Sequence, residues 1–384
     1  ADVPRLIIEH NIHGVDIDPR AAQIAGLSLW LRAQKSWSDN AIQPNQRPQI
    51  QRSNIVCAEP MPGETQLLKE FTSQVQPRVL GQLVEEIFEK MQLAGEAGTL
   101  LKIEEEIRSA IDEAKSQKDE NVLEVQGGLF GGDKWEVREG KRYYNFGDVN
   151  DDFWEQAEKL ILLQLERYAE RASGVGSSQK RLFASDAAKG FAFIDLCRKR
   201  FDVVVMNPPF GECSLDGKAY LAKNYPTTKS DLACSFAERA TGLLVAEGVV
   251  GELTNRTWFF AKKHAKWRKI LLESCCITNL ADLGYGVLDA VVEAAALVWS
   301  KTDAQCDGSF VSALEEKEKS KKLAIRADYL WANSKVFLRL KNNVFAYWIP
   351  QSMLSKYIEM EKVDSAWVKK GLSTADNFRF FRTR

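Results

Sequence analysis

The chain has 384 residues and a formal net charge of −1, and 45% of its residues are apolar. This length predicts two or three structural units, and the apolar content is typical of a folded globular protein rather than a disordered one. A net charge near zero excludes a global positive field that would draw the protein to nucleic acid, so any such contact needs a local basic surface.

Two strand-like segments flank a helix-like segment near the start of the chain. Residues 11–17 form a short apolar run, residues 19–33 repeat apolar side chains at helical spacing, and residues 54–58 form a second apolar run. These periods predict a strand, a helix and a strand. The order is typical of the beginning of an α/β sheet.

Asp16 lies where the first of these strands ends. A carboxylate at that place in a Rossmann-like sheet can accept both ribose hydroxyls of a nucleoside, and Ile17 beside it can pack on the base. Asp18 has a different explanation. It precedes Pro19, so we expect it to cap the helix, with proline at the first helical position.

A long helical segment then interrupts the alternation. Apolar residues recur at helical spacing in residues 80–91, 100–111 and 153–168. We interpret residues 64–180 as a mainly helical insertion. Its Gly-rich and aromatic middle, residues 127–147, predicts a loop or a small hairpin.

The strand pattern returns at residues 201–206, where the nearly unbroken apolar run FDVVVM predicts a buried parallel strand. Helices are predicted at residues 236–246 and 258–273, and strands at residues 249–254, 277–283 and 294–299. The alternation predicts an α/β fold with a Rossmann-like, doubly wound, mostly parallel sheet.

The tetrapeptide Asn207-Pro208-Pro209-Phe210 follows this strand directly, at the strand end where parallel sheets bind ligands. The side-chain oxygen of Asn207 and the carbonyl of Pro208 can each accept a hydrogen bond from an exocyclic amine, which would turn its lone pair toward an incoming methyl group. The prolines fix the backbone, and Phe210 offers a flat face to a base turned out of the duplex. The alternative is a Pro-Pro turn with Phe210 in the core.

This tetrapeptide and its strand resemble the catalytic motif of the amino-group methyltransferases, and Asn at the first position is similar to the adenine-N6 enzymes. The resemblance implies transfer of a methyl group from S-adenosylmethionine to a flipped adenine. It also implies that Asn207 and Pro208 bind the target amine and that Phe210 stacks on the base.

The same resemblance implies a cofactor site on Asp16 and Ile17, with Glu59 near the cofactor's adenine amino group. A solvated loop glutamate explains Glu59 equally well, and Asp186 is a rival for its role. The family carries a glycine-rich loop after its first strand, and no such loop precedes residue 11. We therefore expect the first strand and its loop to lie upstream of Ala1.

The order of parts from residue 6 to residue 384 is similar to the PglX-type adenine methyltransferases of BREX phage-defence systems and to related restriction–modification enzymes. The segments that carry this resemblance are residues 13–25, 54–60, 201–211 and 225–290. Residues 371–381 are similar to the entry into a target-recognition region. The resemblance implies action on double-stranded DNA in phage defence or restriction–modification, with other proteins of a phage-defence system as partners.

The predicted division has four parts. They are residues 1–63 with the first two strands, the insertion at 64–180, the remainder of the methyltransferase domain at 181–312, and a linker with the start of the recognition region at 313–384. Two other functions stay open. One is an RNA or guanine-N2 methyltransferase with the same tetrapeptide, and the other is an inert structural or partner-binding fragment.

Three further features of the sequence bear on its function. Lysines interleaved with aromatic residues at 259–269 could meet phosphates, but the solvated face of an amphipathic helix explains them as well. The seven cysteines are odd in number and form no C-x-x-C pair, which favours reduced thiols in a cytoplasmic protein over a disulfide framework or a zinc site. No segment has the apolar length of a membrane span.

Overall fold

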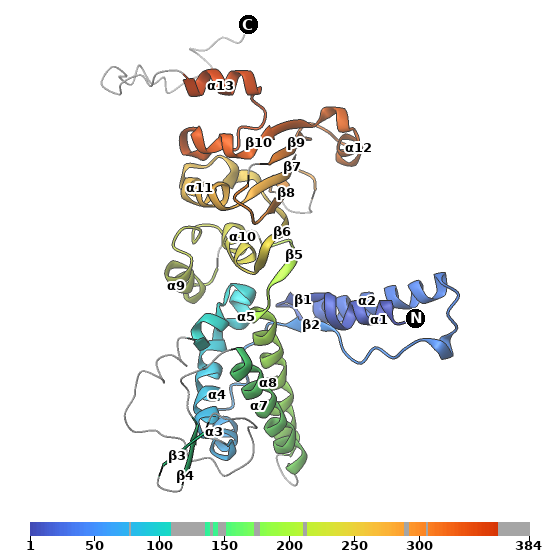
Figure 1. Cartoon of the computed structure of the whole chain (residues 1–384), viewed down its shortest axis with the longest axis vertical. Coiled ribbons are helices and arrows are strands. Elements are labelled where there is room, and N and C mark those ends of the chain that lie inside the picture. The colour runs from blue at the N-terminus through green and yellow to red at the C-terminus, as the bar shows by residue number, and fades with distance from the viewer. Residues whose placement is uncertain are drawn as a thin grey trace. The chain divides into compact units, whose positions relative to one another are not determined.

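The computed structural model describes residues 1–76, 78–108, 135–138, 141–144, 151–172, 177–209, 213–287, 292–304 and 306–359. The chain divides into two compact units, Ala1–Glu252 and Leu253–Arg384 (Figure 1). The finer division into four parts stays a prediction. Phe210 and residues 371–381, to which the sequence assigns a stacking ring and a recognition segment, lie outside the described residues.

The elements of the first unit are α1 (Val3–Leu6), η1 (Ile7–Asn11), β1 (His13–Asp16), α2 (Pro19–Asp39), η2 (Pro44–Gln46), β2 (Asn54–Cys57), α3 (Thr65–Gln74), α4 (Arg78–Lys90), η3 (Met91–Leu93), α5 (Ala94–Ala97), η4 (Gly98–Leu100), β3 (Trp135–Arg138), β4 (Lys141–Tyr144), α7 (Asp151–Arg171), α8 (Ser177–Arg198), β5 (Phe201–Met206), α9 (Leu215–Asn224), α10 (Leu232–Gly242) and most of β6 (Leu244–Asn255). Those of the second unit are η6 (Arg256–Phe259), η7 (Lys262–His264), α11 (Ala265–Ser274), β7 (Cys276–Gly284), β8 (Ala294–Ser300), β9 (Asp307–Ser312), α12 (Lys319–Ala324), η8 (Arg326–Asp328), β10 (Leu330–Asn333), η9 (Ser334–Arg339), η10 (Lys341–Asn343) and α13 (Gln351–Glu359).

The start of the chain folds as its pattern predicts. Strands β1 and β2 pair in parallel, and α2 connects them. Asp18 is the N-cap of α2, since its carboxylate accepts a hydrogen bond from the Arg20 backbone N–H at 2.9 Å, and Pro19 opens the helix. The helix runs past the predicted end to Asp39. Its last turns bury Trp37, whose indole N–H donates to the carbonyl of Ala1.

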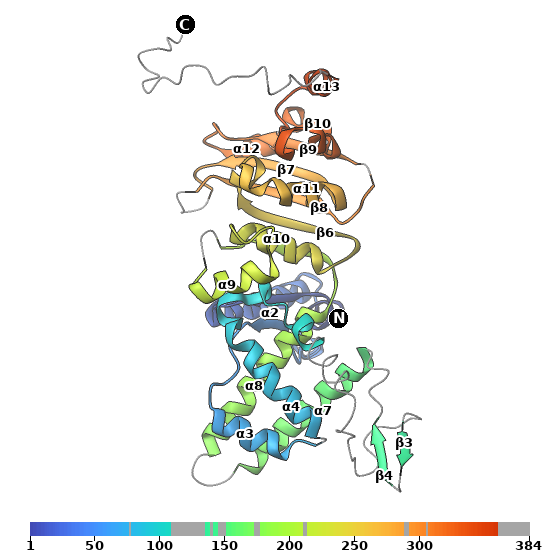
Figure 2. The same cartoon turned by 90° about the vertical axis from the view of Figure 1, so that its left-hand side faces the viewer.

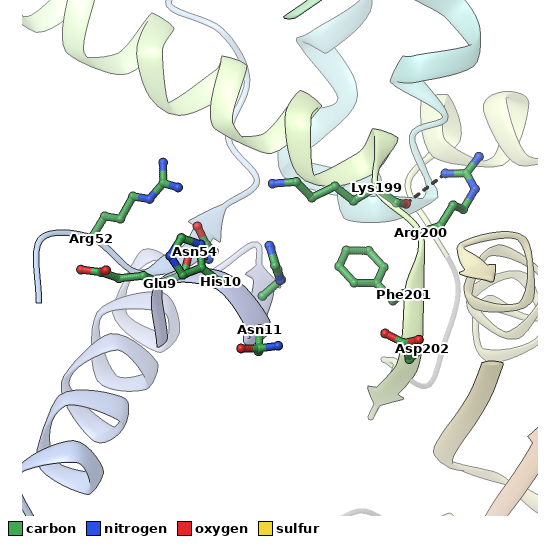
Figure 3. Close-up of a pocket in the computed structure, with 10 residues that line it drawn as sticks. Glu9, His10, Asn11, Arg52, Asn54, Lys199, Arg200, Phe201 and Asp202 are labelled. Carbon is green, nitrogen blue, oxygen red and sulfur yellow. Dashed lines mark hydrogen bonds between the residues drawn. The ribbon is translucent and has the colours of Figure 1, made fainter. Parts of the chain in front are cut away.

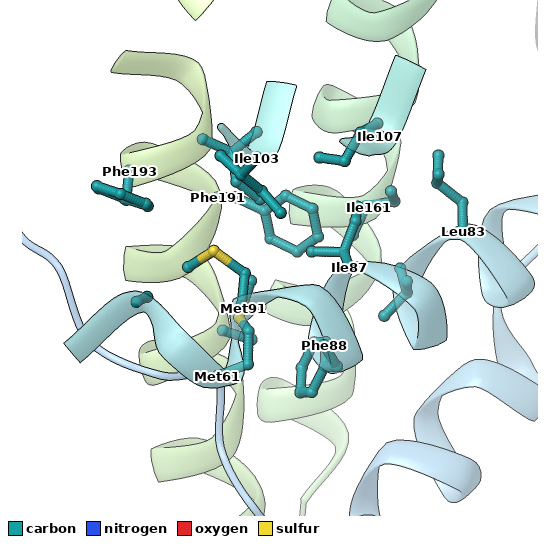
Figure 4. Packing of buried hydrophobic residues seen from close by; sticks show 14 of the residues in the cluster. Met61, Leu83, Ile87, Phe88, Met91, Ile103, Ile107, Ile161, Phe191 and Phe193 are labelled. Carbon is teal, nitrogen blue, oxygen red and sulfur yellow. The ribbon is translucent and has the colours of Figure 1, made fainter. Parts of the chain in front are cut away.

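The predicted insertion is helical, and it forms the main core of the first unit. Helices α4, α7 and α8 lie side by side (Figures 1 and 2). Their apolar faces meet in one buried cluster together with α3 and residues 103–108 (Figure 4). The cluster includes Met61, Ile87, Phe88, Met91, Ile103, Ile161, Phe191 and Phe193. Burial of these apolar faces is the main force that holds the helices together.

This region also contains a hairpin and a long helix, α8. The expected hairpin is present, because β3 and β4 pair antiparallel. Helix α8 has 22 residues, and most of them lie beyond residue 180, where the sequence predicted no helix. It contributes Phe183, Phe191 and Phe193 to the cluster, so it packs with the helices of the insertion.

Strand β5 matches the predicted bounds, residues 201–206, and pairs in parallel with β6. The prediction that it is buried is wrong. Val203 is 60% exposed and Val205 is 81% exposed. Val203 and Val205 point to the same face of the strand, because side chains alternate along it, so this face is open to solvent. Strand β5 also has a strand partner on one edge alone among the described residues. An apolar run predicts burial when both edges and both faces of a strand are covered, and this strand lacks that cover.

The second unit contains a mixed sheet in the order β10-β9-β7-β8 (Figure 2). Strands β7 and β9 are parallel, while β8 and β10 run antiparallel to their neighbours. Helix α11 packs against β7 through Trp267, Leu271 and Leu272, which are buried. The α/β prediction is confirmed, with parallel pairs at β1–β2, β5–β6 and β7–β9.

Two other expectations concern the whole chain. The expectation of seven reduced thiols is wrong at one pair, because Cys276 and Cys306 are joined as a disulfide, with Cα atoms 6.1 Å apart. Cys57, Cys197, Cys213, Cys234 and Cys275 are free. Among the helices that the structure describes, none is long and apolar enough to cross a membrane.

Candidate active site in the first unit

The ends of β1 and β2 bring three of the predicted cofactor residues together. The parallel register places Asp16 beside Cys57, and the backbone N–H of Ala58 donates to the Asp16 carbonyl at 2.8 Å. Ile17 follows β1 directly, and Glu59 is the second residue after β2. Two segments separated by some forty residues thus present Asp16, Ile17 and Glu59 together at the carboxyl ends of β1 and β2.

The side chain of Asp16 is exposed at this edge. One carboxylate oxygen, Oδ1, accepts a hydrogen bond from the backbone N–H of Asp18 at 2.8 Å, which fixes the turn into α2. Ile17 is 51% exposed, so an apolar face is available beside the carboxylate. A carboxylate next to an exposed aliphatic side chain is the combination that a ribose and its attached base require.

Gly98 approaches this edge from the helical region. A Cβ atom at Gly98 would lie 3.3 Å from Cγ2 of Ile17, and the residue has a φ of +51°. Both observations favour glycine, because a side chain would be crowded and the left-handed backbone would be strained. The close approach therefore fixes one side of the space around Ile17.

Glu59 is half-buried and has two polar neighbours. Burial, together with a hydrogen bond and the charge of Glu59, raises the pKa of the Cys57 thiol to about 11, so the thiol stays neutral and can donate to this carboxylate. A hydrogen bond from Lys189 to Asp186, at 2.8 Å, is the main cause that raises the pKa of Lys189, and the charge of Glu59 adds to it. Glu59 and its rival Asp186 thus lie within electrostatic reach of one ammonium group.

Asn207, Pro208 and Pro209 leave the end of β5. Asn207 and Pro209 are exposed, and Pro208 is buried. The buried ring anchors the turn, while the amide of Asn207 stays accessible to a ligand. This arrangement rules out an Asn207 side chain packed in the core. Among the residues with described positions, no hydrogen bond joins Asn207 to Asp16 or Glu59.

The edges of β1 and β5 that face away from their partners are unpaired in the described part of the chain. The two strands start close together, since the rings of His13 and Phe201 are 5.4 Å apart. A pocket of about 350 Å³ lies at these starts, where His10, Asn11, Asn54 and Asp202 also line it (Figure 3). It lies at the opposite strand ends from Asp16 and Asn207, so it is not the predicted site.

The residues present fit the nucleoside half of S-adenosylmethionine. An exposed carboxylate, an exposed aliphatic side chain and a second carboxylate stand at neighbouring strand ends. Hydroxyl groups and an exocyclic amine are donors that carboxylates accept. Asn207 presents an exposed amide at the end of another strand.

The sequence analysis did not identify Cys57, Lys189 or Gly98 as part of this edge. Lys189 follows Asp186 by three residues on a helix, a spacing that predicts their contact. No sequence signal connects either residue to β2, because that neighbourhood arises from the packing of α8 against β2. Gly98 likewise reaches Ile17 through tertiary packing alone.

Comparison with known proteins identifies relatives of the chain. The family model described as Eco57I restriction-modification methylase matches residues 10–287. The adenine-specific methyltransferase BrxX of Escherichia coli O9:H4 (strain HS) is 24% identical over 397 residues, which cover 100% of this chain and 30% of BrxX. The adenine-specific methyltransferase PglX of Lacticaseibacillus casei (strain Zhang) is 24% identical over 206 residues, which cover 48% of this chain and 17% of PglX.

The chain thus spans about 30% of the length of BrxX and less of PglX. Among solved structures, the methyltransferase subunit of a type I restriction-modification system from Streptococcus thermophilus covers 73% of this chain and 78% of its own, at 13% identity and a TM-score of 0.32.

Proposed function

The chain belongs to the Eco57I restriction-modification methylase family, and from this premise we propose that it carries the catalytic residues of a DNA adenine-N6 methyltransferase. The methyl donor is S-adenosylmethionine and the substrate is an adenine turned out of duplex DNA. The observation that carries the proposal is the exposed Asn207 at the end of β5, followed by a buried proline. Two relatives are named as adenine-specific methyltransferases, and this supports adenine, rather than another amine, as the proposed substrate.

At the target side, the amide oxygen of Asn207 accepts one N–H of the adenine amino group, and the Pro208 carbonyl accepts the other. Two acceptors so placed favour a tetrahedral nitrogen, whose lone pair is then free to attack a methyl group. The proton leaves the nitrogen after the methyl group has been transferred, so no strong base is needed. Phe210 stacks on the displaced base in this proposal.

At the cofactor side, Asp16 accepts the ribose hydroxyls, Ile17 packs on the adenine ring, and Glu59 accepts from its amino group. When bound, S-adenosylmethionine supplies the activated methyl group. In this proposal, a further strand followed by a glycine-rich loop pairs with the edges of β1 and β5 that are unpaired among the described residues. Calorimetry with S-adenosylmethionine on this chain and on an N-terminally extended version tests that part, since tighter binding by the extended version is expected.

The decisive experiment changes Asn207 to alanine at the chromosomal locus and maps N6-methyladenine in the DNA of the cells. The variant is expected to lose the modification. Because Asn207 is exposed, its free energy of unfolding should change by less than about 0.5 kcal/mol. Asn40→Ala, at the exposed end of α2, is the matched control and should keep the modification. Methylation that persists in Asn207→Ala would exclude the proposed role.

Two other functions make different predictions in the same cells. An RNA or guanine-N2 methyltransferase would leave DNA adenine unchanged and would alter modified bases in RNA or at guanine. An inert structural or partner-binding fragment would leave all methylation unchanged in Asn207→Ala. Duplex DNA as substrate, a role in phage defence and partners from the same defence system are part of the proposal, and the loss of N6-methyladenine is its first requirement.

A further inference from the structure

A group of exposed basic side chains stands out on the second unit. Lys262, Lys263, Lys266 and Lys269 lie on η7 and α11, and all four are exposed. Trp267 and Arg268, which alternate with them, are buried. Within the described part of the chain, Lys269 alone of these four lysines forms an ion pair, with Glu273 at 3.6 Å, and both side chains are more than half exposed. An exposed pair of this kind contributes little to stability.

Arg268 holds a second basic segment next to this helix. Its guanidinium is fully buried and donates to the carbonyls of Asn342 and Asn343, with Nη2 at 2.7 Å from the Asn342 oxygen and Nε at 3.0 Å from the Asn343 oxygen. Other donors of the same group reach the carbonyls of Trp258 and Ala261. The buried arginine therefore joins three backbone segments at one point.

The segment that Arg268 holds is a left-handed bend. Asn342 and Asn343 have φ values of 60° and 55°, a conformation that asparagine adopts more readily than most other side chains. Exposed Arg339 and Lys341 lie just before this bend. We call the six residues Lys262, Lys263, Lys266, Lys269, Arg339 and Lys341 the basic surface.

The charge of the two units supports a separate role for this surface. Residues 1–252 contain 30 Lys and Arg against 39 Asp and Glu, whereas residues 253–384 contain 22 against 14. The total charge of −1 therefore hides an acidic unit and a basic unit. Salt screens charges beyond about one Debye length, ~8 Å at physiological salt. The electrostatic field at the basic surface therefore depends mainly on the basic side chains that form it.

We propose that the basic surface binds the phosphate backbone of duplex DNA, a step that rests on the proposed function and names where the second unit holds its substrate. A solvated helix face explains the four lysines by themselves. It does not explain why a buried arginine fixes a bend with two more exposed basic residues against the same helix. Lysine and arginine contacts to phosphates position a duplex without reading its sequence, so this surface supplies affinity and orientation.

The test measures binding of the full chain to a fluorescent duplex over a range of salt concentrations, by fluorescence anisotropy. The Asn207→Ala background and the absence of S-adenosylmethionine separate binding from methyl transfer. K262Q/K266Q should reduce the slope of log affinity against log salt by about 2, or about 1 for each lysine. The matched control is K317Q/K321Q, which removes two exposed lysines that lie among Glu315, Glu316 and Glu318. It should leave the slope unchanged.

Several results would overturn the inference without touching the proposed function, which the N6-methyladenine map decides. They are an unchanged slope in K262Q/K266Q, an equal loss in both double variants, and an unsubstituted chain whose DNA binding does not depend on salt. Stronger lysine-dependent binding to single-stranded RNA or to anionic lipid vesicles would assign the surface to another partner. Both double variants alter exposed side chains, and circular dichroism confirms that each is folded before binding is measured.

Discussion

The strands β5 and β7, one in each unit, differ in how their apolar side chains are covered. The apolar run FDVVVM of β5 predicts burial, whereas in β7 polar residues separate Ile277 from Leu280. In β7, Ile277 and Leu280 are at most 1% exposed, because β8 and β9 pair with both of its edges and α11 packs against it. In β5, Val205 is 81% exposed. The number of neighbours, rather than the apolar run, decides the burial of a strand.

Each unit also buries an arginine–carboxylate pair, and the pairs differ in access to water. Arg239 and Glu104 in the first unit are 5% and 6% exposed, with hydrogen bonds from both Nη atoms to the carboxylate. In the second unit Asp282 is fully buried, but Arg256 is 16% exposed and Tyr347 also donates to the carboxylate at 2.8 Å. The second carboxylate therefore keeps a donor when its arginine is removed.

The largest expected effect breaks the more buried pair. Arg239→Ala leaves Glu104 buried without its main donors, which typically costs about 3–5 kcal/mol of the free energy of unfolding. Arg256→Ala should cost less, because Tyr347 still donates to Asp282. Urea unfolding of the two variants measures both values. The double substitution of Arg239→Met and Glu104→Leu should recover most of the first loss, and a double variant as unstable as Arg239→Ala would contradict the explanation.

A smaller effect sharpens the comparison of strands. Val311 in β9 is 1% exposed, so Val311→Ala should cost about 2 kcal/mol through lost burial and the cavity left behind. Val205→Ala makes the same chemical change on the exposed strand and should cost less than about 0.5 kcal/mol. Unfolding midpoints in urea test this pair directly. Equal losses would mean that Val205 is covered in solution.

The smallest effect concerns the exposed start of α2. A hydrogen bond from the Arg20 side chain, followed by one from its backbone N–H, lowers the pKa of Asp18 from 3.8 to about 2. A lowered pKa means that the carboxylate contributes stability fully above pH 3.8 and loses it as the pH falls through about 2. An NMR titration of the Asp18 carboxyl group should show the low midpoint. Arg20→Ala should move the midpoint back toward 3.8, whereas Glu64→Ala, as a control, should leave it unchanged.

Local signals predicted much of the fold and part of the candidate site. The Asp18-Pro19 pair located the start of α2, and the bounds of β5 agree with its apolar run. The register of β1 and β2 brings Asp16 and Glu59 to the same edge, as the strand pattern indicated. These features depend on residues that are close in sequence or on the regular geometry of a parallel pair.

Other features could not be predicted, because they depend on which segments meet. Lys189 adjoins Glu59 because α8 packs on β2, and Gly98 reaches Ile17 across more than eighty residues. The exposure of Val205 reflects an uncovered face of β5, which the residues of the strand cannot reveal. Arg268 is one more basic residue in the sequence, whereas in the folded unit its guanidinium is buried and bound to backbone carbonyls.

The sequence by itself determined the α/β pattern, the helix cap at Asp18 and the position of Asn207 directly after β5. Secondary-structure propensity, helix capping and strand boundaries each depend on a few neighbouring residues. Tertiary structure alone decided the exposure of Val205, the surroundings of Glu59 and the contact of α11 with residues 342–343 through Arg268. The physical reason is that burial and electrostatic environment depend on atoms from distant parts of the chain, and no local period encodes which of those parts will be neighbours.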